Sequence, residues 1–152
     1  MVGGELGGRD DLPSNLIAHG YLETEAYREV LGSCDVGLGS CGLHRIPLQE
    51  ACPLKTRDYL ASGLPVIVPY ADTALEEAKA RDGRYPEWVL KVPNESGNLV
   101  AEKAGIVEFC RRWAGRRVAR AEVEPLIDFF VLERRRLGFF EEICQEEEAR
   151  VR

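Results

Sequence analysis

The segment Pro53-Leu-Lys-Thr-Arg-Asp-Tyr-Leu-Ala-Ser-Gly-Leu-Pro-Val-Ile-Val68 decides the fold. Pro53 suits a first helical turn, where its missing N–H costs nothing, and Gly63 suits the left-handed position that follows a helix. Pro65 prevents renewed helix, and the β-branched run 66–68 is typical of a strand covered on both faces. The segment therefore predicts a helix that turns directly into a buried strand, which is one half of an α/β repeat.

The amino end of this helix is where we expect a ligand. In open parallel sheets, ligands bind over the carboxyl ends of the strands, where helix N-termini point. Lys55 lies in the first turn, beside backbone N–H groups that have no partner within the helix, and this combination suits a phosphate group. Glu50 stands on the approach to the helix, and Asp58 stands further along it.

Strand-like and helix-like segments alternate on both sides of this stretch. The expected strands are Leu16–Ala18, 35–39, 66–68 and 88–92, with a strand stub at Met1-Val2. The other expected helices are 25–31 with Thr24 as N-cap, 72–80 capped by Asp72 or Thr73, 98–114, 119–126 broken at Pro125, and 126–149. This alternation favours a parallel sheet of roughly four strands plus the stub.

Composition excludes several classes of function. The chain has 152 residues and a formal net charge of −6, which argues against nucleic acid as a partner. Its five cysteines form no Cys-x-x-Cys pair and it has only two histidines, so we expect no metal site and reduced thiols in a cytoplasmic protein. The sequence offers neither a signal peptide nor an apolar run long enough to cross a membrane.

Four stretches together resemble the C-terminal half of the GT-B glycosyltransferases of the group 1 type. They are Gly20-Tyr-Leu, Ser33-Cys-Asp-Val-Gly-Leu-Gly39, the segment 53–67, and the closing segment 133–143. In this family two Rossmann-like domains face each other, and the second binds a nucleotide-sugar donor. The resemblance runs from Val2 to about Ile143, and it is most specific between Lys55 and Ile67.

The resemblance implies an α/β fold with a Rossmann-like, mostly parallel sheet flanked by helices. Residues 1–123 would form a partial nucleotide-sugar-binding domain, and 124–152 would form a C-terminal helix packing on it. The family's first strand and its acceptor domain have no counterpart here, so the chain is similar to an N-terminally incomplete piece of a longer enzyme. We therefore expect an open sheet edge and no turnover by the isolated chain.

The resemblance also assigns roles to particular residues. Glu50 would act near the anomeric carbon of the transferred sugar, and Asp58 would accept hydrogen bonds from the ribose hydroxyls. Lys55 and the backbone at Pro53 and Leu54 would lie by the diphosphate. Gly3 and Gly4 form a further candidate phosphate loop. Two features depart from the family pattern: aspartate replaces the usual glutamate at position 58, and Ala51-Cys52-Pro53 replaces a Gly-rich loop.

The predicted function is donor binding in a transferase that moves a sugar from a nucleotide-diphosphate sugar to a hydroxyl of a sugar or lipid-linked acceptor. No metal or other cofactor is expected. The alternatives are a non-catalytic module that binds a nucleotide or a protein partner, and a nucleotide-sugar epimerase fragment. The arginines at 111, 112, 116, 117 and 120 are read as a solvated face, with peripheral contact at the inner face of the membrane as the alternative.

Overall fold

The computed structural model describes residues 13–46 and 48–151. The predicted strand stub at Met1-Val2 and the candidate phosphate loop at Gly3 and Gly4 lie outside the described residues. The chain divides between Cys34 and Asp35 into two compact units.

The first unit contains helix α1 (Thr24–Ser33), which buries Leu31. Glu23, and not Thr24, is its N-cap residue, so the predicted start was wrong by one position. The predicted strand at Leu16–Ala18 was also wrong, because these residues form no strand in the structure. Ile17 is exposed there, and a short apolar run becomes a strand only when a neighbouring strand accepts its backbone hydrogen bonds.

The second unit is built on a three-stranded parallel sheet. Its strands are β1 (Gly37–Leu38), β2 (Val66–Val68) and β3 (Val89–Lys91), in the order β1-β2-β3. Gly37 is paired with Val66, and Val66 in turn with Val89. All three strands were expected from the sequence, and the described part of the chain is a mixed α/β structure with an open parallel sheet and seven α-helices.

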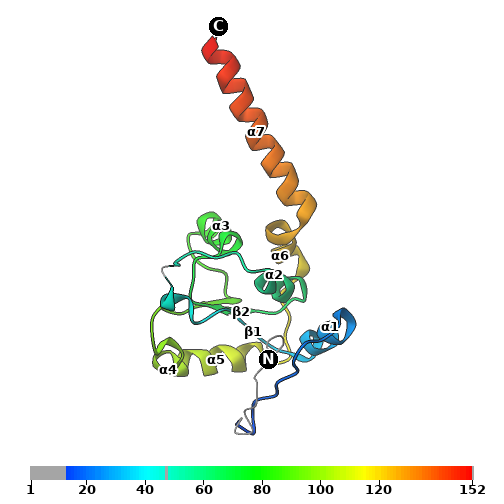
Figure 1. Ribbon diagram of the computed structural model, residues 1–152, viewed down its shortest axis with the longest axis vertical. Coiled ribbons are helices and arrows are strands. Elements are labelled where there is room, and N and C mark those ends of the chain that lie inside the picture. The colour runs from blue at the N-terminus through cyan, green and yellow to red at the C-terminus, as the bar shows by residue number, and fades with distance from the viewer. Residues whose placement is uncertain (1–12, 47, 152) are drawn as a thin grey trace. The chain divides into compact units, whose positions relative to one another are not determined.

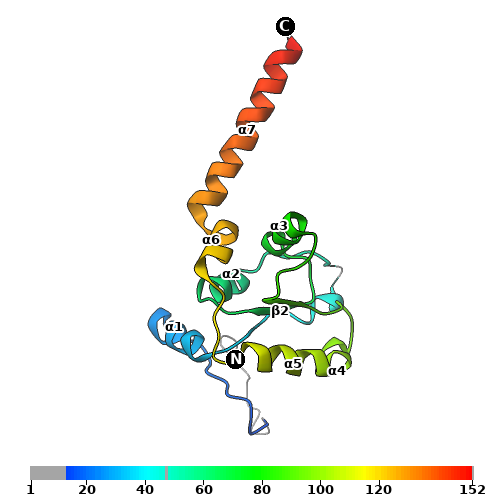
Figure 2. The ribbon, with the colours of Figure 1, turned by 180° about the vertical axis from the view of Figure 1, so that it is seen from behind.

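Helices cover both faces of this sheet. Helices α2 (Leu54–Ala61) and α3 (Thr73–Asp82) lie on one face, and α4 (Asn98–Ala101) and α5 (Lys103–Trp113) lie on the other (Figures 1 and 2). The single helix predicted over 98–114 is therefore two helices, which meet at Glu102. A short 3-10 helix, Leu43–Arg45, lies in the loop after β1.

Two further helices follow α5. Helix α6 (Arg120–Ile127) contains Pro125 and packs on α2 and α3. The predicted domain boundary between residues 123 and 124 falls inside this helix. Helix α7 (Phe129–Val151) follows after a single residue and contacts α6. Among the described residues, no helix has both the length and the apolar character that crossing a membrane requires.

The core lies between the sheet and its helices. Its largest fully buried side chains include Trp88, Tyr70, Leu60, Leu64 and Leu75. Trp88 and Trp113 are both buried. Each indole N–H has an acceptor: Trp88 donates to the Glu122 carboxylate at 2.9 Å, and Trp113 donates to the Glu87 carbonyl at 3.4 Å.

Glycines let α2 approach β1 closely. A Cβ on Gly37 would lie 2.6 Å from Cγ of Tyr59 in α2, which is closer than real contacts allow. A Cβ on Gly39 would lie 2.9 Å from the hydroxyl oxygen of Tyr70. At the other end of α2, Gly63 has a φ of +69°, as the turn predicted after this helix requires.

Candidate functional site

The candidate site is built at the carboxyl edge of the parallel sheet. The segment that leads into α2 runs alongside the residues after β2. There Glu50 forms a parallel bridge with Ala71, the Ala51 N–H donates to the Ala71 carbonyl at 2.9 Å, and the Ala71 N–H donates to the Gln49 carbonyl at 3.0 Å. Backbone hydrogen bonds therefore hold Glu50 at the edge where ligands bind in this architecture.

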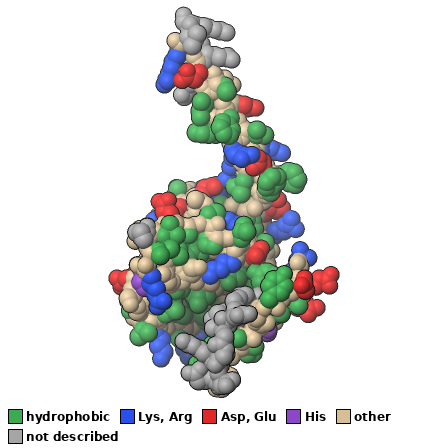
Figure 3. Space-filling model, viewed as in Figure 1, with side chains coloured by type: hydrophobic (Ala, Val, Ile, Leu, Met, Phe, Trp, Pro, Cys, Tyr) green, Lys and Arg blue, Asp and Glu red, His purple; other side chains and the backbone are tan. Residues whose placement is uncertain are grey.

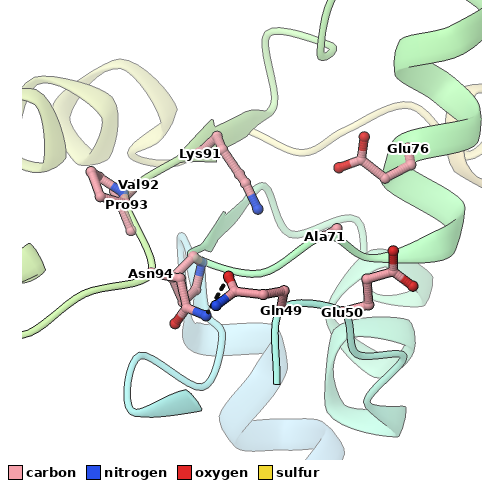
Figure 4. A pocket seen from close by; sticks show the side chains of 9 residues that line it. Gln49, Glu50, Ala71, Glu76, Lys91, Val92, Pro93 and Asn94 are labelled. Carbon is pink, nitrogen blue, oxygen red and sulfur yellow. Dashed lines mark hydrogen bonds between the residues drawn. The ribbon is translucent and has the colours of Figure 1, made fainter. Parts of the chain in front are cut away.

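An open pocket of about 600 Å³ lies at this edge. Its lining comes from the approach to α2, the ends of β2 and β3, and the first turn of α3: Gln49, Glu50, Pro69, Ala71, Glu76, Lys91, Val92, Pro93 and Asn94. Figure 4 shows Lys91 and Asn94 on one side of it and Glu50 and Glu76 on the other. Carboxylates, amides and an ammonium group together suit a ligand with several hydroxyl groups.

Lys91 is the cation of this pocket. It ends β3 and is half-buried, and burial lowers its pKa while the charge of Glu76 partly opposes that shift. Within the described residues, no carboxylate oxygen lies within 4 Å of its Nζ. Glu76 instead pairs with Lys79 at 3.6 Å and accepts a hydrogen bond from the Tyr85 hydroxyl.

Asn94 lines the pocket on the same side as Lys91. Its Nδ2 donates to the Leu48 carbonyl at 3.1 Å and to Oε1 of Gln49 at 3.3 Å. Its Oδ1 is buried without a hydrogen-bond partner. A buried acceptor of this kind is a place where a ligand hydroxyl or a water can donate.

Lys55 lies in the first turn of α2, after Pro53 as the N-cap residue. It is half-buried and close to Cys41 in the loop after β1. Burial lowers the pKa of Lys55, and burial raises the pKa of the Cys41 thiol. Among the described residues, Lys55 also has no carboxylate within 4 Å of its Nζ, so the first turn of α2 presents an uncompensated positive charge.

Polar contacts hold the first turns of α2 and α3 together. Nη1 of Arg57 lies 2.8 Å from Oδ1 of Asp72, and Nη2 of Arg57 lies 2.8 Å from Sγ of Cys52. Asp72 is fully buried and caps α3 by accepting from the Ala74 N–H at 3.1 Å, so of the two predicted caps, Asp72 and Thr73, the structure has the first. On the inner side of α2, the hydroxyls of Thr56 and Tyr70 are 2.8 Å apart and hydrogen-bonded.

The structure sorts the predicted site residues into two groups. Glu50 lines the pocket beside Ala71, after β2. Pro53, Leu54 and Lys55 form the amino end of α2, where Leu54 is 81% exposed. Lys55 and Asp58 are not among the lining residues of the pocket, and Asp58 is an exposed residue further along α2.

Sequence reasoning missed Lys91 and the pairing of Arg57 with Asp72. A signal for Lys91 was present, because a charged residue closing an apolar strand lies at the edge where parallel sheets bind ligands. The partner of Arg57 is 15 residues away along the chain (72 − 57), and nothing in the sequence indicates that pairing. Asn94 follows the strand expected over 88–92, and its contact with Gln49 depends on tertiary structure.

No group of three or more His, Cys, Asp or Glu side chains in the described parts of the chain is arranged to hold a metal ion. The five cysteines are all free thiols. Comparisons with protein-family models, with curated proteins and with solved structures found no match to this chain.

Proposed function

We propose that this chain is the donor-binding half of a glycosyltransferase of the GT-B kind. The observation that carries the proposal is Lys55: a half-buried lysine in the first turn of α2, at the ligand-binding edge of a parallel sheet, with no carboxylate within 4 Å among the described residues. A diphosphate supplies the negative charge that such a position favours.

The chemistry of the proposal is stabilisation of a leaving group. In sugar transfer, the bond from the anomeric carbon to the diphosphate oxygen breaks, and the acceptor hydroxyl oxygen bonds to that carbon and loses its proton. Negative charge grows on the diphosphate as the bond breaks. The Lys55 ammonium and the N–H groups of the first turn of α2 stabilise that charge without a metal ion.

The neighbouring pocket is where the sugar ring would lie. Its Glu50 and Glu76 carboxylates accept hydrogen bonds from hydroxyls, and the Lys91 ammonium donates to them. Its volume of about 600 Å³ is in the range of small-molecule sites. Glu50 belongs to this pocket and lies three residues before Pro53, the N-cap of α2, so it links the sugar position to the diphosphate position.

Isothermal titration calorimetry with UDP-glucose and GDP-mannose tests donor binding. We expect one of the two to bind, and Lys55→Ala to raise its dissociation constant about tenfold or more, because a charge-assisted contact to phosphate is lost. Arg111→Ala removes the same charge from an exposed position on α5 and is the matched control. Absence of binding to both nucleotide sugars by a folded chain, or equal weakening by both substitutions, would contradict the proposal.

Glu50→Gln separates the sugar contact from the nucleotide contact. We expect it to weaken binding of the nucleotide sugar while leaving binding of the free nucleoside diphosphate unchanged, because only the sugar reaches Glu50. If free UDP or GDP binds but the attached sugar adds nothing in the wild-type chain, the nucleotide-binding module is the better description. We also expect the chain alone to release no UDP or GDP from the donor.

A further inference from the structure

Helix α7 exposes an unusual number of large apolar side chains. Seven of them are exposed: Phe129, Phe130, Leu132, Leu137, Phe139, Phe140 and Ile143. Figure 3 shows hydrophobic side chains on the surface of this helix, next to charged ones. Exposed apolar surface of this extent on a helix is typical of a site that binds a partner.

Four of these seven residues, together with Arg136, have the spacing of a helix that pairs with another helix. Phe129, Leu132, Arg136, Phe139 and Ile143 recur at alternating steps of three and four residues, which is the a and d pattern of a coiled-coil seam. The single polar residue of the seam, Arg136, is bonded to Glu133 of the same helix at 2.6 Å. A polar residue at an a position is typical of a pairing whose register is specified.

The distribution of charge along α7 selects the orientation of a helical partner. The basic run Arg134–Arg136 lies in the first half of the helix, and the carboxylates Glu141, Glu142 and Glu147 lie in the second half. Two parallel copies would place the basic runs side by side, which is repulsive. Two antiparallel copies place each basic run beside the acidic half of the other copy.

We propose that α7 pairs antiparallel with α7 of a second copy of this chain. The proposed register places Leu132 against the partner's Ile143. It also places Arg136 over the ring of the partner's Phe139. Arg135 faces the partner's Glu142, and although Arg135 already pairs with Glu77 of α3, a guanidinium has five donors and holds a second carboxylate. This pairing is independent of the proposed function.

The seam covers only two heptad repeats, so the dimer is expected to be reversible and dependent on concentration. Sedimentation equilibrium of the full chain measures it. Phe139→Glu should raise the dissociation constant roughly a hundredfold or more, because each dimer loses two buried aromatic contacts. Leu137→Glu is the matched control, because Leu137 is off the seam and is 58% exposed against 59% for Phe139.

Circular dichroism must show the same helix content in both variants. The proposal is overturned if the wild-type chain is monomeric at every concentration, or if the two substitutions weaken association equally, which would indicate unspecific apolar contact.

Disulfide cross-linking tests the orientation. Two chains are made, both with Cys144→Ser, one carrying Leu132→Cys and the other Ile143→Cys. Oxidation of their mixture should give a disulfide between positions 132 and 143, located by mass spectrometry of tryptic peptides. Disulfides that join 132 to 132 or 143 to 143, in place of this mixed product, would show a parallel pair and overturn the antiparallel arrangement.

Discussion

Helix α2 spans 8 residues and α7 spans 23, yet α2 is the more firmly held of the two. Helix α2 buries Thr56 and Leu60, accommodates its close approach to β1 through glycine, and is tied to α3 by Arg57. Helix α7 is richer in aromatic residues, but all four of its phenylalanines are exposed. The difference teaches that length and apolar content do not decide how a helix is anchored, whereas complementary neighbours do.

The largest expected effect comes from breaking the polar contact that holds α2 to α3. Asp72→Ala should lower the free energy of unfolding by roughly 3–5 kcal/mol, because it leaves the Arg57 guanidinium without its carboxylate and removes the cap of α3. Urea denaturation followed by circular dichroism measures it. Glu133→Ala, which removes an exposed ion pair of α7, should cost less than about 0.5 kcal/mol. A loss below about 1 kcal/mol for Asp72→Ala would refute this account of how α2 is anchored.

The second comparison uses one residue type in both helices. Leu60→Ala should lower the free energy of unfolding by about 2–5 kcal/mol, because Leu60 is fully buried and its removal leaves a cavity. Leu137→Ala in α7 should change it by no more than about 0.5 kcal/mol. The same denaturation experiment applies. Similar losses for the two variants would mean that α7 is as well packed in solution as α2.

Glycine offers a third matched pair. Gly37→Ala should cost about 1–3 kcal/mol, because the added Cβ collides with the Tyr59 side chain of α2. Gly138→Ala, in α7, meets nothing within 4 Å and should stabilise the chain by about 1 kcal/mol through helix propensity. Thermal unfolding of both variants should therefore move the melting temperature in opposite directions. A Gly37→Ala variant that melts at or above the wild-type temperature would contradict the close packing of α2 on β1.

The smallest expected effect concerns the positive charge of Lys55 in α2, which burial destabilises. Burial lowers the pKa of Lys55 from 10.5, so the folded chain binds fewer protons than the unfolded chain just below that pH, and stability rises as pH rises through this window. Lys55→Met should stabilise the chain slightly at pH 7, and this gain should shrink as the pH approaches 10.5.

Urea denaturation of both chains at neutral and alkaline pH checks this prediction. Lys103→Met, at an exposed lysine of α5, is the control. A variant less stable than the wild-type chain at pH 7 would show that the Lys55 ammonium is compensated in the folded chain, and would also weaken the case for a phosphate there.

Local signals predicted the part of the fold that positions the site. Gly63 ends α2 with a positive φ, Asp72 caps α3, and the run 66–68 is a fully buried strand, as the residue types indicated. The strand expected at Leu16–Ala18 failed, because a strand requires a partner that local sequence does not reveal. The single helix expected over 98–114 failed at Glu102, where apolar spacing alone gave no sign of a break.

The sequence by itself determined the order of the three sheet strands and of the two α-helices between them, because caps, glycines and β-branched runs act on their own neighbourhoods. It also placed Glu50 and Lys55 at the approach to α2 and in its first turn. Only the tertiary structure decided that Arg57 meets Asp72, that Lys91 and Asn94 share a pocket with Glu50, and that the apolar side of α7 is exposed. These three features depend on contacts between segments that are distant in the sequence. Such contacts form only when the chain folds, and no single stretch of sequence specifies them.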